Sequence, residues 1–220
     1  MDHGMLAEEM IGCCQGKVSR FAAVFGLTIG FFVPVEAFAK RSCLSALAEL
    51  DAATRLHGPL VGVEVPVEVT GALGGVWYRS YLPRTLVLDC SLVVSLARAG
   101  RILREAGVTE IMFSSAYQRR NVRGTNRPSR HGRGLAIDLH ELRGDSIGVL
   151  KVDDDFEQGL GDDVDCLGSP VTKAGTILRT IFCDLSRGGL FRLLLSPDSD
   201  PDHYNHFHIE ALPWDERDDG

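Results

Sequence analysis

The sequence predicts an α+β domain, and three observations lead to this fold class. Residues 89–106 carry apolar side chains at helical spacing, whereas residues 134–142 alternate in the way of a strand. Several further short strands are expected between the helices. The connections are too close for regular βαβ units, which excludes a doubly wound parallel sheet. At 220 residues the chain is long enough for one domain with a substantial core.

The elements of the first half are predicted in order. Residues 43–56 read as a short helix. Residues 61–69 alternate valine with Gly, Glu and Pro, which is typical of an edge strand or an extended arm. Residues 81–83 mark a turn around Pro83. The helix at 89–106 places Leu92, Leu96, Ala99 and Leu103 on one face and ends before Gly107.

The second half continues with strands and one helix. A strand is expected at 108–115, followed by the strand at 134–142, whose two faces carry Leu135, Ile137 and Leu139 on one side and Ala136, Asp138 and His140 on the other. The remaining predictions are a strand at 146–152, a helix at 171–185 that ends near Gly188, and strands at 191–195 and 205–211. The acidic run 153–165 departs from the EF-hand pattern and is interpreted as a solvated loop.

The N-terminal segment has the pattern of an export signal. Lys17 and Arg20 precede an apolar stretch over residues 21–35, and the Ala37-Phe-Ala39 end suits a signal peptidase. We expect cleavage after Ala39, with an uncleaved membrane anchor as the alternative and Met10 as an alternative start. The expected domains are residues 1–39 as signal or anchor, 40–215 as the folded domain and 216–220 as an acidic tail.

The net charge limits the classes of binding partner, and the cysteine content indicates the cellular compartment. The formal net charge of -7 argues against a nucleic-acid partner. Cleavage would leave four cysteines, Cys43, Cys90, Cys166 and Cys183, which in an exported domain suggest two disulfides with three connectivities open. We therefore expect a periplasmic or secreted protein that touches a membrane only if the N-terminal segment stays attached. Four buried thiols are the alternative in a cytosolic chain.

Two histidine-rich segments carry the chemistry. His131 and Asp138 lie in the first, and His206 and His208 lie in the second. Positions i and i+2 of a strand share a face, so His206 and His208 point to the same region. Gly132 and Gly134 allow the loop before Asp138 to turn tightly. Two imidazoles and a carboxylate with one open position are what metal-assisted hydrolysis requires, and the fourth residue can act as general base.

Each of these residues also has a simpler interpretation. Alone, His131 would be a capping or surface residue, and Asp138 would be a buried carboxylate paired with an arginine. His140 and His203 could orient a metal ligand from behind. Ordinary exposed polar side chains are the alternative for both.

The motifs resemble a known family. Residues 129–138 fit the Ser-x-His-x-x-Gly-x-Ala-x-Asp pattern of the zinc D-Ala-D-Ala carboxypeptidase and murein endopeptidase group, and the segment His206-Phe-His208 fits their closing motif. Together with residues 115–124 and 202–208, the chain looks most like the extensin-like C-terminal family, over about residues 90–210.

The resemblance implies a small antiparallel sheet with flanking helices and a Zn²⁺ site in a groove over the sheet. It implies His131, Asp138 and His208 as ligands and His206 as general base. A Tyr-x-x-Arg element implies Arg120 as the group that stabilises the anionic intermediate, but Arg119 stands where a cysteine is usual, so both arginines remain candidates. The same departure shifts the expected disulfide partner of Cys183, with Cys166 as the candidate.

Three functions are weighed from the sequence. The leading one is an exported zinc hydrolase that cleaves an amide bond in peptidoglycan peptides. The second is a non-catalytic cell-wall module stabilised by its metal. The third is hydrolysis of an ester or of another peptide at the same metal. The chain offers no Gly-x-Ser-x-Gly nucleophile motif, and manganese remains an alternative to zinc.

Overall fold

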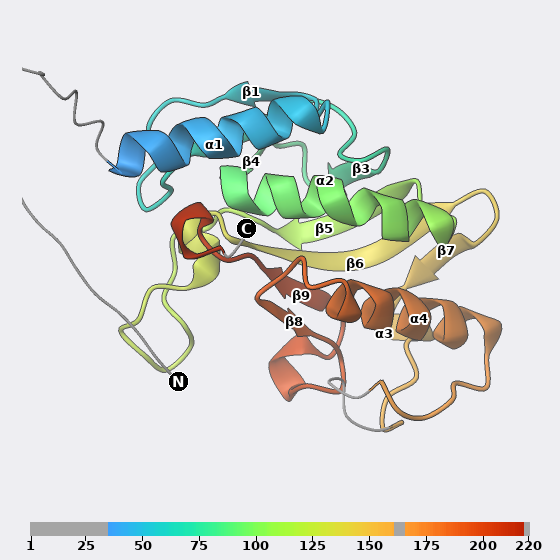
Figure 1. The fold of residues 1–220 in the computed structure, drawn as a ribbon. Coiled ribbons are helices and arrows are strands. Elements are labelled where there is room, and N and C mark those ends of the chain that lie inside the picture. Colours follow the sequence, from blue (N-terminus) through green and yellow to red (C-terminus); the bar gives the residue numbers. More distant parts are fainter. Residues whose placement is uncertain (1–34, 161–165, 218–220) are drawn as a thin grey trace, which may run out of the picture. The chain divides into compact units, whose positions relative to one another are not determined.

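The computed structural model describes residues 35–160 and 166–217 (Figure 1). One compact unit spans Val33–Gly220. Its helices are α1 (Val35–Glu49), α2 (Cys90–Glu105), α3 (Val152–Asp155) and α4 (Lys173–Arg187), with 3-10 turns η1 (Arg130–Arg133), η2 (Pro201–His203) and η3 (Trp214–Glu216). Its strands are β1 (Thr54–Leu56), β2 (Pro66–Val69), β3 (Trp77–Ser80), β4 (Leu86–Asp89), β5 (Glu110–Ser115), β6 (Ala136–Gly144), β7 (Gly148–Lys151), β8 (Leu193–Leu195) and β9 (Phe207–Glu210).

The strands form two sheets. The smaller has the order β1-β2-β4 and is antiparallel throughout. The larger has the order β3-β5-β6-β9-β8, with β7 also paired to β6. All of its pairs are antiparallel except β3 with β5, which run parallel. The predicted α+β class with a mainly antiparallel sheet is therefore confirmed.

Three helices and the sheets enclose the core. Helix α2 contacts α1 on one side and α4 on the other (Figure 1). Leu92, Leu96 and Leu103 of α2 are buried, as their spacing predicts. From the large sheet, β6 contributes Ile137 and Leu139 to the core. Strand β9 contributes Phe207 and Ile209. The neighbouring residues of β6 and β9 point to the opposite face, and these include the histidine and aspartate residues of interest.

The predicted ends of the helices agree closely with the structure for α2 and α4, but not for α1. Helix α2 begins after Asp89, whose carboxylate accepts a hydrogen bond from the backbone N–H of Ser91, and α4 begins after Thr172 and ends at Gly188. The first helix is shifted: it begins at Val35, before the expected cleavage position, and ends at Glu49. Residues 54–56 form strand β1 instead of continuing the helix.

The expected edge strand at 61–69 needs a correction. Only Pro66–Val69 forms a strand, β2, and it pairs on both sides, with β1 and with β4. The proline suggested an edge, but it stands at the first position of the strand. The central position of β2 was not predicted because its partner on one side, β4, is hard to recognise in the sequence. Strand β4 has only four residues, between a proline turn and the cap of helix α2. The sequence analysis also did not identify β3.

The four cysteines form two disulfides, as expected. Cys43 pairs with Cys90 and Cys166 pairs with Cys183. The first bond joins α1 to the start of α2, and the second joins the loop before α4 to that helix. Of the expected signal or anchor segment, residues 1–39, the part over residues 1–34 lies outside the described residues. Within the described part, no helix has the length and apolar character of a membrane span.

Candidate metal centre

Strands β6 and β9 place four polar side chains in a compact arrangement on one face of the sheet. The register sets Asp138 of β6 directly opposite His208 of β9. Such cross-strand neighbours have their Cβ atoms about 4.5–5.5 Å apart. Because β6 and β9 are antiparallel, His140, two residues after Asp138, and His206, two residues before His208, lie on the same side of this pair. Their rings stack, with centroids 5.1 Å apart.

His131 reaches this arrangement from η1. The side chain of Ser129 caps this short turn by accepting a hydrogen bond from the backbone N–H of His131. Gly134 ends the turn with a φ of 67°. A Cβ atom there would lie 2.7 Å from the backbone nitrogen of Asp89, so the close approach of η1 to the start of α2 requires glycine. The His131 side chain is completely buried as a result.

His131, Asp138 and His208 converge, and we call these three residues the inner cluster. The Nε2 atom of His131 lies 3.2 Å from Oδ1 of Asp138, and Nδ1 of His208 lies 2.7 Å from the same oxygen. One ligand atom from each residue lies within 4.8 Å of the other two. All three residues are buried. The structure thus brings together the three residues that the sequence analysis singled out as ligands.

In both histidines of the inner cluster, the ring nitrogen that faces away from Asp138 lies close to an oxygen acceptor. Nδ1 of His131 lies 2.8 Å from the carbonyl oxygen of Ala116, which can only accept, so this nitrogen carries the proton. Nε2 of His208 lies 3.2 Å from Oε1 of Glu210. In each ring the other nitrogen points at Asp138. An acceptor behind the ring and a nitrogen turned inward are typical of metal-binding histidines.

The Nε2 atom of His131 gives a direct test of whether this cluster suits a cation. It is buried and has no hydrogen-bond partner. Because Nδ1 carries the proton, Nε2 presents a lone pair to an oxygen of Asp138 that also has only lone pairs to offer. Such a buried, unsatisfied arrangement is unfavourable unless a positive charge lies between the two atoms. The residues present therefore fit a divalent cation.

The charges of the cluster agree with this interpretation. Burial raises the pKa of Asp138, but hydrogen bonds and charge interactions with the protonated forms of His131 and His208 outweigh this and bring the pKa well below its usual range. Burial lowers the pKa of His208, but its hydrogen bonds to Asp138 and Glu210 outweigh this and raise it to about 9. The protein thus stabilises positive charge at the inner nitrogen of His208, and a metal ion would displace that proton.

His206 lies beside the inner cluster, immediately before β9. Its Nε2 is 3.6 Å from Oδ1 of Asp138, and its Nδ1 is 2.8 Å from the side-chain oxygen of Asn205. Burial lowers the pKa of His206 to about 4, so its ring is neutral at neutral pH. Phe207, the next residue, packs against Phe182 in the core. A neutral imidazole with one nitrogen directed at the cluster can accept a proton there.

An irregularity in β5 supports this side of the site. The pairing with β6 shifts between Phe113 and Ser115, so that Ser114 is an extra residue. Its hydroxyl lies 2.7 Å from Nε2 of His140, whose ring stacks on His206. The irregular strand thereby fixes His140 behind His206.

The two candidate arginines are both exposed, and they differ in their contacts with the inner cluster. Nη2 of Arg120 is 3.8 Å from Oδ2 of Asp138, at the edge of the cluster. Among the ion pairs of the described residues, none joins Arg119 to the cluster. The geometry therefore places Arg120 beside the cluster.

His203 is a fifth histidine in this region, and it is partly exposed. Its Nδ1 lies 2.8 Å from both carboxylate oxygens of Asp200, which precedes η2. Its ring centroid is 5.2 Å from those of His206 and His208. Ligand atoms of His203, His206 and His208 also lie within 4.8 Å of one another.

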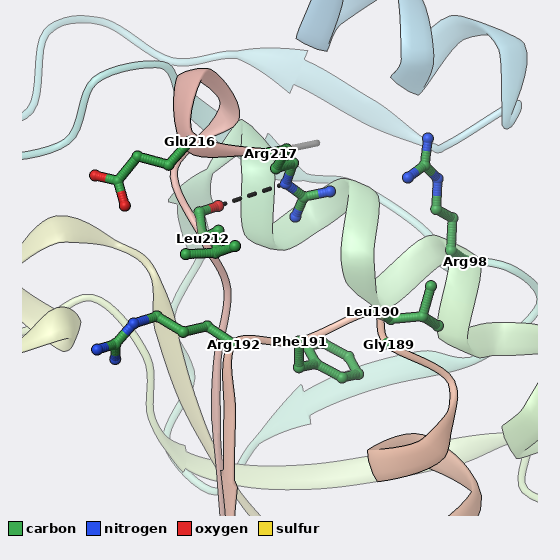
Figure 2. A pocket seen from close by; sticks show the side chains of 8 residues that line it. All are labelled: Arg98, Gly189, Leu190, Phe191, Arg192, Leu212, Glu216 and Arg217. Atoms are coloured by element: carbon green, nitrogen blue, oxygen red, sulfur yellow. Dashed lines mark hydrogen bonds between the residues drawn. The ribbon is translucent and has the colours of Figure 1, made fainter. Parts of the chain in front are cut away.

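A separate cavity of about 310 Å³ lies near the start of β8 and the C-terminal segment. It is lined by Arg98, Gly189, Leu190, Phe191, Arg192, Leu212, Glu216 and Arg217 (Figure 2). Figure 2 shows the guanidinium groups of Arg98 and Arg192 pointing away from each other, so these two charges do not converge on one ligand. The described histidines do not line this cavity. Arg192 links the two regions, because its Nη1 is 2.7 Å from Glu210.

Several orienting residues were missed by the sequence analysis. Glu210 was detectable, because it lies two residues after His208 on the same strand face. Asp200 had a weaker signal, as a helix cap before proline. Ala116 acts through its backbone carbonyl, which no residue pattern reveals.

The comparisons with known proteins give one result. The family model described as "Extensin-like protein C-terminus" matches residues 43–217, which include the inner cluster, His203, His206 and Arg120. No curated protein and no solved structure shows significant similarity to the chain.

Proposed function

The chain belongs to the extensin-like protein C-terminus family, and we propose that it is an exported zinc-dependent hydrolase that cleaves an amide bond in peptidoglycan peptides. One observation carries the catalytic part of this proposal: the buried, unpartnered Nε2 of His131 faces an oxygen of Asp138 beside an inward nitrogen of His208. The motif resemblance to the zinc D-Ala-D-Ala carboxypeptidase and murein endopeptidase group supports the choice of substrate.

His131, Asp138 and His208 would hold the zinc ion. Two imidazoles and one carboxylate are a ligand set of catalytic zinc sites, which keep one position open for water or substrate. When bound, zinc supplies Lewis-acid activation of water and of the scissile carbonyl. Ala116 and Glu210 keep the two histidine rings in the orientation that this role requires.

His206 would serve as the general base. Its ring is neutral at neutral pH, its Nδ1 is held by Asn205, and its Nε2 points toward the inner cluster. It can therefore take a proton from the attacking water and later pass it to the leaving amine. Arg120 would stabilise the negative charge that develops on the carbonyl oxygen, because a fixed guanidinium lowers the energy of such a charge.

The proposed location outside the cytosol rests on two features. Two disulfides are expected in an oxidising compartment and are rare in the cytosol. The apolar segment at 21–35 has the pattern of an export signal. A periplasmic or secreted hydrolase would meet cell-wall peptides there.

The test combines zinc analysis with digestion of isolated muropeptides of several cross-link types. We expect zinc-dependent release of peptide fragments by the wild-type protein. His206→Ala should retain zinc and lose turnover, because the base is not a ligand in this proposal. His57→Ala removes an exposed histidine outside the site and is the matched control.

Three outcomes would contradict the proposal or one of its parts. If the wild-type protein bound zinc but cleaved none of the muropeptides, the chain would be a metal-stabilised cell-wall module. If it cleaved esters or other peptides in preference to muropeptides, the catalytic assignment would stand and the substrate assignment would fail. Unchanged turnover in His206→Ala would exclude this residue as the base.

A further inference from the structure

The connection between β5 and β6 gathers arginines beside the inner cluster. Its two arms pair at Asn121 and Pro128, which makes it a hairpin (Figure 1). Between Glu110 and Asp138 the sequence has no acidic residue but six arginines: Arg119, Arg120, Arg123, Arg127, Arg130 and Arg133. The chain as a whole has a formal net charge of -7. Residues 119–133 are therefore a positively charged segment of an acidic protein, and we call them the arginine hairpin.

Three features hold the arginine hairpin at the rim of the candidate metal centre. Nη2 of Arg120 lies 3.8 Å from Oδ2 of Asp138. Arg123 forms an ion pair with Asp202, which belongs to the turn η2 beside the site. The hairpin ends in the turn η1, which carries His131 of the inner cluster. Its positive charge therefore lies next to the candidate reaction centre.

Half of this charge has no acidic partner. Arg119, Arg127 and Arg133 are exposed, and no ion pair within the described residues involves them. By contrast, the exposed Arg101 of α2 lies 3.2 Å from Glu105. The arginine hairpin thus keeps an excess of positive charge. Such a field attracts anionic ligands and can raise their rate of association by about 10- to 1000-fold.

We propose that the arginine hairpin selects peptide substrates that carry a free carboxylate close to the scissile bond. This inference rests on the proposed function and adds the charge of the substrate to it. Arg119 and Arg127 would bind the carboxylate, because a guanidinium can donate hydrogen bonds to both of its oxygens. Arg120 keeps its separate role at the anionic intermediate. A C-terminal carboxylate and a side-chain carboxylate both fit this chemistry, and the test distinguishes them.

The test compares three forms of one muropeptide stem peptide. The first has all carboxylates free, the second has only its C-terminal carboxylate amidated, and the third has only its side-chain carboxylates amidated. At low ionic strength, kcat/KM of the free form should exceed that of one amidated form by about 10-fold, the lower end of the range for steered association. That form identifies the carboxylate. The preference should shrink at about 0.15 M salt, where the Debye length is about 8 Å.

A double variant tests the hairpin itself. Arg119→Gln combined with Arg127→Gln removes two positive charges without breaking an ion pair of the described residues. It should lose the preference through a higher KM for the free form, with kcat nearly unchanged. Arg101→Gln combined with Arg187→Gln is the matched control, because it changes the net charge equally on α2 and α4. Equal kcat/KM for all three peptides, or an equal loss of preference in both double variants, would overturn the inference.

Binding of the same peptides, measured by isothermal titration calorimetry, separates this inference from the proposed function. If the wild-type protein cleaved none of the peptides but bound the free form more tightly, and the hairpin variant lost this difference, the proposed function would fail. The selection of carboxylates by the hairpin would still be supported. If the protein cleaved and bound all three forms equally, the proposed function would stand and the inference would be wrong.

Discussion

At the scale of single residues, the candidate site is defined by what lies behind each side chain. His131 has a backbone carbonyl behind it, His208 has Glu210, His206 has Asn205 and His203 has Asp200. Each acceptor engages one ring nitrogen, and in His131, His208 and His206 the other nitrogen faces Asp138. Because rotation of a histidine ring would lose a hydrogen bond, the inward nitrogens are positioned before any ligand binds.

Glu210 gives the first prediction at this scale. Glu210→Gln removes the carboxylate that accepts from Nε2 of His208, while the side chain keeps its size. We expect zinc affinity to fall by about 10- to 100-fold, as for other residues that orient metal ligands. Competition with a coloured chelator measures this. Glu68→Gln is the control, because Glu68 forms a surface ion pair with Arg55; equal affinities in the two variants would exclude the orienting role.

The adjacent arginines give a second prediction. Both side chains are exposed, but only Arg120 is described with a contact to Asp138, at 3.8 Å. If Arg120 stabilises the anionic intermediate, Arg120→Ala should lower kcat by about 10²–10³, the range found when one such donor is removed. Arg119→Ala should change kcat little. Steady-state kinetics on a muropeptide substrate distinguish the two, and the reverse order of effects would assign the role to Arg119.

At the scale of elements, two segments position the site: the turn η1 with strand β6, and the turn η2 with strand β9. The register between β6 and β9 sets Asp138 against His208. The turn η1 places His131 on the same face of the sheet. This placement is possible because Gly134 lets the chain pass close to the start of α2. The geometry of the inner cluster therefore depends on one glycine as well as on its ligands.

Gly134→Ala tests this dependence. The residue has a φ of 67°, and its new Cβ atom would lie 2.7 Å from a backbone nitrogen. A left-handed conformation alone costs about 1–2 kcal/mol for a residue with a Cβ atom. We expect a larger loss of unfolding free energy, because backbone must also move, together with weaker zinc binding. Gly58→Ala is the control, since nothing lies within 4 Å of its position. Urea unfolding and zinc titration measure both effects.

The two disulfides constrain different elements and should differ in their effect on stability. Cys43–Cys90 has a sequence separation of 47 and Cys166–Cys183 one of 17. Loop-closure entropy predicts that alanine replacement of the pairs lowers the free energy of unfolding by about 4 and about 3 kcal/mol respectively. Denaturant unfolding of the two double variants measures the difference. A larger loss for the shorter loop would show that contacts other than chain entropy dominate.

The sequence predicts some elements of the fold better than others. The helix at α2 is predictable from apolar spacing and the cap at Asp89, and β6 from its alternation. Strands β3 and β4 have only four residues each, and their partners in the sheets lie far away in the sequence. Their formation depends on tertiary pairing, which local patterns do not encode. The same reason explains why β2 was expected at an edge.

The residues of the candidate site also differ in how well the sequence predicts them. His131, Asp138, His206 and His208 were predictable as a group, because their types and spacing match both strand geometry and a known motif. The proximity of Arg120 to Asp138 was not predictable to the single residue, because it depends on how the loop after β5 folds. The backbone carbonyl of Ala116 and the extra residue Ser114 depend on an irregular pairing of β5 with β6, which only the three-dimensional structure shows.

At the scale of the whole domain, the inner cluster joins parts of the chain that are distant in sequence. Asp138 and His208 are 70 positions apart, and the strands that carry them lie next to each other in the large sheet. Their neighbours Ile137, Leu139 and Phe207 belong to the core. The cluster and the core thus form on opposite faces of the same strand pair, and loss of this pairing would separate the ligands.

This connection predicts that metal binding stabilises the whole domain. A ligand that binds only the folded state adds about 2.7 kcal/mol at a free concentration of 100 times its Kd. Zinc at that level should raise the unfolding free energy by this amount, and removal of zinc with a chelator should reverse the effect. In His131→Ala the gain at the same zinc concentration should be much smaller, since an inner ligand is missing.

Urea unfolding with and without zinc measures this gain, with the unfolding of β6 and β9 followed by amide hydrogen exchange. His57→Ala should gain as much as the wild-type protein, because His57 lies outside both groups of ligands. An equal gain in His131→Ala would mean that zinc stabilises the domain through other residues. If zinc slowed amide hydrogen exchange only in the η2 segment and not in β6, the ion would bridge the exposed histidines without contacting Asp138. Because the inner cluster spans both strands, we expect protection to rise in β6 and β9 together.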